Sequence, residues 1–144
     1  MKAIELKGVS FSYDGFTDFV LKGVDFSVEY GEVALLSGLS GEGKSTLLSI
    51  VSGIIPNIVS GKITGEVLVD GQSTAGQKLS VVCRKVGVVL QNADSQIIHN
   101  IVEDEIAFGC ENFAIPTDKI GAQIDRVCAI MGLDKSMQTR TLSG

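Results

Sequence analysis

The sequence has 144 residues, 44% hydrophobic and 20% charged, which are proportions typical of an ordinary globular domain. Its 12 Lys and Arg residues against 17 Asp and Glu residues give a formal net charge of −5, which argues against non-specific nucleic-acid binding as its main activity. No apolar run approaches the roughly 18 residues that a membrane-spanning helix needs, and the three cysteines form no C-x-x-C pair indicating a metal or redox site.

Three strands are predicted in the first 36 residues. Residues 3–13 alternate between apolar and polar side chains, with an interruption at Gly8 that predicts a bend. Residues 24–29 alternate cleanly and predict a half-exposed strand. Residues 33–36 are a short, wholly apolar run, which predicts a parallel strand buried on both faces.

The stretch from Gly38 to Thr46 reads GLSGEGKST and fits the phosphate-loop pattern G-x-x-x-x-G-K-[ST] without a mismatch. Glycines allow backbone N–H groups to form a concave nest for phosphate oxygens. In this pattern Lys44 supplies positive charge to the β- and γ-phosphates, and the Ser45 hydroxyl is a ligand for Mg²⁺. Apolar residues at helical spacing follow, and Gly53 marks the end of that helix, whose N-terminus would face the phosphates.

The sequence therefore predicts a nucleoside triphosphate site with Mg²⁺; a glycine-rich turn before an ordinary helix is the alternative interpretation. The predicted binding residues of the loop are all nine of its members: Gly38, Leu39, Ser40, Gly41, Glu42, Gly43, Lys44, Ser45 and Thr46.

Two strands are predicted after the loop. Residues 65–71 read as a strand closed by an Asp-Gly turn, although Asp70 at the end of an apolar run also resembles a magnesium-binding aspartate. Gly71 follows it directly and the flanks alternate, which favours the hairpin turn. Residues 86–90 are wholly apolar and predict a buried core strand.

The pattern becomes helical from about Ser95 onward. One predicted helical segment carries its apolar residues between 101 and 108, and another begins after Pro116. Residues 103–105 are a carboxylate cluster that we expect in the first turn of a helix. His99 has no carboxylate or cysteine at ligand spacing, which favours a structural or surface role. We expect residues 1–94 to form a nucleotide-binding core with a β subdomain, and residues 95–144 a partial helical subdomain.

Three further elements, in order around the phosphate loop, give the sequence its resemblance to the ATP-binding cassette (ABC) ATPases. They are Tyr13, which lies in Phe-Ser-Tyr ahead of the loop, Gln91 directly after the last apolar run, and the terminal Leu142, Ser143 and Gly144. This resemblance implies an α/β fold of the P-loop NTPase type, with an antiparallel β subdomain and part of a helical subdomain.

The resemblance also implies roles for these residues. Tyr13 would stack on the adenine of ATP, and Gln91 would act beside Lys44 in catalysis by ligating Mg²⁺ or positioning the attacking water. The terminal Leu-Ser-Gly would begin the signature motif, which grips the γ-phosphate bound to an opposite cassette. A second cassette is therefore an implied partner, as a separate copy, a related chain or a second cassette in the same natural chain.

A narrower resemblance is carried by residues 91–97, which read QNADSQI, and by residues 102–109, which read VEDEIAFG. Both look like the ATPases of energy-coupling-factor importers, which take up vitamins and metal ions. Ala93 stands where that family usually has proline. The resemblance implies a transmembrane coupling subunit as partner, contacted through Gln96 and Phe108, and a peripheral location on the cytoplasmic face of the membrane.

The family's Walker B aspartate, catalytic glutamate and switch histidine have no counterparts in these residues. We therefore expect an N-terminal fragment, ending inside the signature motif, that binds ATP but hydrolyses it poorly or not at all. The alternatives are a nucleotide-binding module without turnover and a soluble, non-transport ABC ATPase. The latter would be expected to carry insertions or basic extensions, and neither is present.

Overall fold

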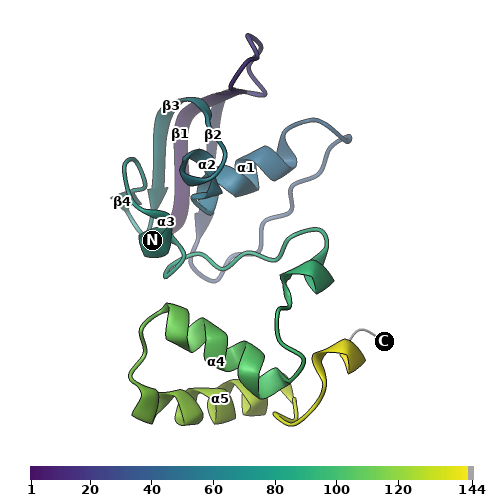
Figure 1. Ribbon diagram of the computed structural model, residues 1–144. Coiled ribbons are helices and arrows are strands. Elements are labelled where there is room, and N and C mark those ends of the chain that lie inside the picture. Colours follow the sequence, from purple (N-terminus) through teal and green to yellow (C-terminus); the bar gives the residue numbers. More distant parts are fainter. Residues whose placement is uncertain (143–144) are drawn as a thin grey trace. The chain divides into compact units, whose positions relative to one another are not determined.

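The computed structural model describes residues 1–142, and the chain forms two compact units, Met1–Val88 and Val89–Gly144 (Figure 1). Within residues 1–142, the structure has no helix with both the length and the apolar character needed to cross a membrane.

The first unit contains a four-stranded antiparallel sheet with strand order β2-β1-β3-β4 (Figure 1). Its strands are β1 (Lys2–Tyr13), β2 (Leu21–Glu29), β3 (Gly61–Val69) and β4 (Gln72–Ser73). The three strands predicted from alternating side chains are confirmed, because alternation places one apolar row on the buried face of an antiparallel sheet.

Two glycine-dependent features of this sheet are confirmed. Gly8 has φ +56°, and the pairing register of β1 shifts on either side of it, so the predicted bend is a bulge. Asp70 and Gly71 both have positive φ, +53° and +69°, as a tight two-residue turn between β3 and β4 requires. Asp70 therefore lies in the predicted hairpin turn and not in a magnesium-binding strand.

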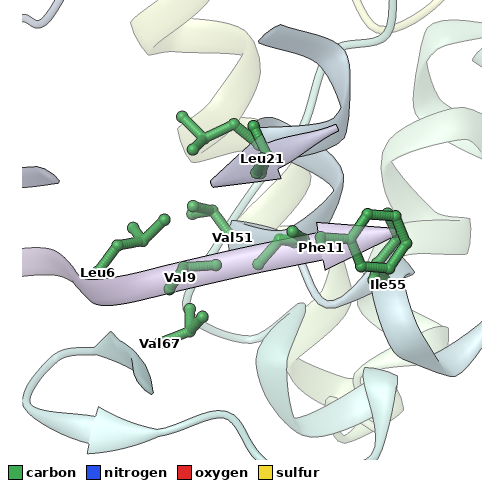
Figure 2. Close-up of a cluster of buried hydrophobic side chains, with 9 residues drawn as sticks. Leu6, Val9, Phe11, Leu21, Val51, Ile55 and Val67 are labelled. Atoms are coloured by element: carbon green, nitrogen blue, oxygen red, sulfur yellow. The ribbon is translucent and has the colours of Figure 1, made fainter. Parts of the chain in front are cut away.

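Helices α1 (Lys44–Val51) and α2 (Ile54–Asn57) pack against the sheet, and the short α3 (Leu79–Val82) follows β4 (Figure 1). Figure 2 shows the apolar side chains of the central strand β1 at the middle of this packing. Removing these side chains from water is the main stabilising contribution to the unit. The buried cluster consists of Leu6, Val9, Phe11, Leu21, Leu47, Ile50, Val51, Ile55 and Val67.

The two strands predicted from continuous apolar runs, residues 33–36 and 86–90, are wrong. Neither run is a strand, and Val33, Leu35 and Val89 are 96%, 89% and 81% exposed. A wholly apolar strand depends on hydrogen-bonded neighbours and on cover over both faces. Within residues 1–142, no strand pairs with either run.

The second unit contains the helices that the sequence predicts after about residue 95. A 3₁₀ turn, η1 (Ala93–Gln96), is followed by α4 (Val102–Asn112), α5 (Thr117–Met131) and a second 3₁₀ turn, η2 (Thr139–Thr141). Helices α4 and α5 pack on each other (Figure 1), and α5 begins after Pro116 as the sequence indicates. Their small buried core contains Val102, Ile124 and Cys128.

The first turn of α4 carries the predicted acidic cluster, Glu103, Asp104 and Glu105. Negative charge is favourable there because the first N–H groups of a helix carry partial positive charge. Two of these N–H groups also have backbone partners: the N–H of Val102 donates to the Met137 carbonyl, and that of Glu103 to the Lys135 carbonyl.

Candidate nucleotide-binding site

The backbone of the phosphate loop takes a shape that requires glycine. Gly38, Gly41 and Gly43 have φ of +154°, +86° and +88°, in the region that L side chains rarely adopt. Gly43 is constrained a second time, because a Cβ at this position would lie 2.9 Å from the Leu21 Cδ2 atom and 3.3 Å from the Val20 carbonyl oxygen. The loop thus enters α1 by passing directly against the start of β2.

Lys44 is the first residue of α1, and its side chain turns back over the loop. Its Nζ atom donates hydrogen bonds of 2.8 Å to the Gly38 carbonyl oxygen and 2.5 Å to that of Leu39. The ammonium group is therefore held over the loop, the place where the sequence pattern puts a β- or γ-phosphate.

The N-terminus of α1 differs from that of α4 in charge, because the first turn of α4 holds three acidic residues. In the part of the chain that the structure describes, no side chain caps α1, and its first turn holds no acidic residue. The first N–H groups of a helix lack partners inside the helix and attract anions. Together with Lys44, they give this end of α1 groups that can attract an anion, in a chain of net charge −5.

An open hollow of about 240 Å³ lies beside the loop. Leu21, Val24 and Phe26 of β2 line one side, and Glu42 and Lys44 line the other. A mainly apolar hollow with a few convergent polar groups is a common form of small-molecule site. The phosphate loop is therefore accessible from the side of β2.

Tyr13, the residue predicted to stack on the base, contacts Thr46 of the phosphate loop. Tyr13 is the last residue of β1, and its hydroxyl shares a 2.8 Å hydrogen bond with the Oγ1 atom of Thr46 in α1. The Tyr13 ring also stands edge-on to the Phe11 ring, with a centroid separation of 4.9 Å. The structure thus connects the predicted base-stacking residue to the predicted phosphate loop, whereas Ser45 is exposed.

The other predicted site residues belong to the second unit. Gln91 is exposed just before η1. The Oε1 atom of Gln96 accepts a 2.7 Å hydrogen bond from the Leu90 N–H, and the half-buried Phe108 ring lies 5.1 Å from the His99 ring. Leu142 is 40% exposed. Ser143 and Gly144, the other two residues of the predicted signature, lie outside the described residues.

His99 has a carboxylate partner, Glu105, that the sequence spacing did not indicate. The Glu105 Oε2 atom accepts hydrogen bonds from the N–H groups of Ile98 (3.0 Å) and His99 (2.8 Å), and it lies 3.2 Å from His99 Nδ1. Burial opposes the charge on Glu105, but these hydrogen bonds outweigh it and lower the pKa of this carboxyl. Acidic residues in the first turn of a helix often accept hydrogen bonds from N–H groups just ahead of it. This tendency is the sequence signal that could have indicated the contact between Glu105 and His99.

The chain matches the family model described as "ABC transporter" over residues 21–144. It is 38% identical to an ABC transporter ATP-binding protein of Methanosarcina acetivorans and to one of Streptomyces coelicolor, each over 98% of this chain. It covers only 22% and 25% of the lengths of these two relatives. An ABC transporter ATP-binding protein of Pyrococcus horikoshii is 37% identical over 86% of this chain and 44% of its own.

A solved structure gives the same result for the fold. CbiO1 of Clostridium perfringens, described as part of the ABC transporter complex cbiONQ, superimposes with a TM-score of 0.81 at 27% identity, over 99% of this chain and 56% of its own. The ABC ATPase fold predicted from the sequence is thereby confirmed. The chain belongs to the ABC transporter family of ATP-binding proteins.

Proposed function

We propose that the chain binds Mg-ATP at the loop from Gly38 to Thr46. The observation that carries the proposal is the position of the Lys44 ammonium group, which two loop carbonyl oxygens hold beside the uncapped N-terminus of α1. Backbone N–H groups and one lysine give the positive, concave surface that a triphosphate requires. The hydroxyl of Ser45, exposed at the same end of α1, is the proposed protein ligand of Mg²⁺.

The family couples ATP binding and hydrolysis to transport, and we infer that the protein works as the motor of an importer of the energy-coupling-factor type. The segments 91–97 and 102–109 support this inference, as does the likeness to cbiO1, which is described as part of a transporter complex. Its cargo would be a vitamin or a metal ion. The protein would act as a peripheral subunit on the cytoplasmic face of the membrane, beside a transmembrane coupling subunit.

The proposed ATP site is shared between two cassettes. In this arrangement Gln91 would ligate Mg²⁺ or position water for its own cassette, and the segment that begins at Leu142 would contact the γ-phosphate held by the other one. The 144-residue chain supplies the phosphate loop but has no counterpart of the family's water-activating glutamate. We therefore expect it to bind ATP with little turnover.

A thermal-shift experiment with a phosphate-release assay tests the proposal. Mg-ATP should raise the Tm of the wild-type chain, because a ligand that binds only the folded state stabilises it. Lys44→Ala should abolish the shift, whereas Lys22→Ala, a change at an exposed lysine of β2, should leave it intact. A shift that survives Lys44→Ala would contradict the assignment of the loop. Turnover at the rate of an intact cassette would contradict the expected inactivity.

A further inference from the structure

We propose that Thr46 is a positioning residue for base recognition: its hydroxyl fixes the Tyr13 ring at a set distance from the phosphate loop. This inference rests on the proposed ATP site and extends it. The observation behind it is the 2.8 Å hydrogen bond between the Tyr13 hydroxyl and the Thr46 Oγ1 atom, which joins residues 33 positions apart in the sequence.

The Tyr13 ring is held at two places. Its hydroxyl is bound to Thr46, which is only 5% exposed, and its ring meets Phe11, which is fully buried, at an interplanar angle of 82°. Neither neighbour has room to move, because both are packed in the core of the first unit. Tyr13 itself is only partly buried, so part of its surface remains available to a ligand.

Thr46 is the third residue of α1, so it shares one rigid turn with Lys44 and Ser45. A ring bonded to Thr46 therefore keeps its distance from the groups that would hold the phosphates. A nucleotide joins its base and its phosphates through one sugar. Both ends bind at full strength only if the two subsites are already at the matching separation, because ordering a loose subsite costs binding free energy.

The hydrogen bond should thus increase the affinity for ligands that carry a base. It should not change the affinity for a phosphate chain without a base. The informative quantity is the ratio of the Kd for Mg-ATP to the Kd for magnesium tripolyphosphate, since it cancels any contact that Thr46 makes with phosphate. Tyr13→Phe keeps the ring and removes the hydroxyl, and Thr46→Val keeps the shape and removes the hydroxyl. Each should raise the ratio roughly fivefold, the equivalent of one ordinary hydrogen bond.

Tyr30→Phe is the matched control. It removes a tyrosine hydroxyl with a hydrogen bond of the same length, 2.8 Å to Asp70 Oδ1, at the turn between β3 and β4. It should leave the ratio unchanged. The sequence has two tyrosines and no tryptophan, so Tyr30→Phe also leaves Tyr13 as the only tyrosine. Quenching of its fluorescence by Mg-ATP, but not by tripolyphosphate, should then report a base on the ring.

A double-mutant cycle decides whether the two hydroxyls act together. The variant carrying both Tyr13→Phe and Thr46→Val should raise the ratio no further than either single change, because both remove the same bond. Additive effects, or a ratio that stays at the wild-type value in Tyr13→Phe, would overturn the proposal and leave the ATP site itself standing. If the wild-type chain binds tripolyphosphate and ATP equally well, base recognition by Tyr13 is absent and the proposal fails. If it binds neither, the proposed ATP site fails first.

Discussion

The Thr139 hydroxyl donates a 2.7 Å hydrogen bond to the carbonyl oxygen of His99, 40 residues earlier in the sequence. Thr139 is 7% exposed, and its N–H donates to the neighbouring Asn100 carbonyl at 2.9 Å. The turn η2, which leads into Leu142, is therefore fixed to the segment that precedes α4. Any displacement of that segment within the second unit would move η2 with it.

The first prediction concerns this bond. Thr139→Val leaves the His99 carbonyl without its hydroxyl partner, and we expect a loss of about 1–2 kcal/mol in the stability of the second unit. Thr141→Val is the control, because the Thr141 hydroxyl is exposed and donates to the carbonyl of Gln138, three residues earlier in the sequence. Native-state hydrogen exchange of the α4 amides measures the loss of stability in each of the two variants. Equal protection in the two variants would show that the bond contributes nothing.

The second prediction concerns pH. The folded state holds the pKa of Glu105 below its ordinary value of 4.5, so this group stabilises the fold above that value. The contribution is lost as the pH falls through the lowered pKa, when the carboxylate gains a proton and accepts less strongly from the N–H groups of Ile98 and His99. Glu105→Gln should therefore flatten the acid side of the stability curve.

Helix content followed by circular dichroism from about pH 3 to pH 7 checks this, since the range spans the ordinary titration of a carboxyl group. The control is Glu103→Gln, at an exposed position in the same turn of α4. It should change the pH profile less than Glu105→Gln does. A Glu105→Gln profile that matches the wild type would contradict the account of this carboxylate.

The third prediction separates two costs of replacing a loop glycine. Gly41 and Gly43 have nearly equal φ, but among the described residues nothing lies within 4 Å of a Cβ at Gly41. Gly41→Ala should cost roughly 1–2 kcal/mol from the backbone conformation alone. Gly43→Ala should cost about 1–3 kcal/mol more, because its methyl group would press on Leu21. Urea unfolding of both variants measures the difference, and equal costs would show that the chain relaxes around Gly43.

The fourth prediction concerns the proposed transmembrane partner. Gln96→Ala and Phe108→Ala should weaken copurification with the transmembrane coupling subunit while leaving the Kd for Mg-ATP unchanged. Gln96→Glu keeps an oxygen that can accept from the Leu90 N–H, so it separates loss of that internal bond from loss of a partner contact. Normal assembly in both alanine variants would remove Gln96 and Phe108 from the contact surface.

The elements predicted correctly are those for which the chain supplies a visible structural partner. The alternating strands found antiparallel neighbours through β1, and the acidic cluster at residues 103–105 lies where a helix begins. The apolar runs at 33–36 and 86–90 failed because apolar character alone does not supply a hydrogen-bonded neighbour.

The missed contacts depend on tertiary packing. The bond between Tyr13 and Thr46 exists because the end of β1 meets the first turn of α1, and nothing in the spacing of the two residues indicates this. The pairing of His99 with Glu105 depends on how the chain turns into α4. The phosphate-loop pattern, by contrast, fixed the identity of its residues in advance because its chemistry is local.

The central claim is that the loop from Gly38 to Thr46 binds ATP through Lys44. Equilibrium dialysis of labelled ATP with Mg²⁺ tests it most directly, using the wild-type chain and Lys44→Ala side by side. The account predicts saturable binding of one ATP per wild-type chain and a loss of affinity of at least about tenfold in Lys44→Ala, as expected when a charge-assisted contact is removed. Equal affinity in the two proteins, or no saturable binding by the wild type, would contradict it.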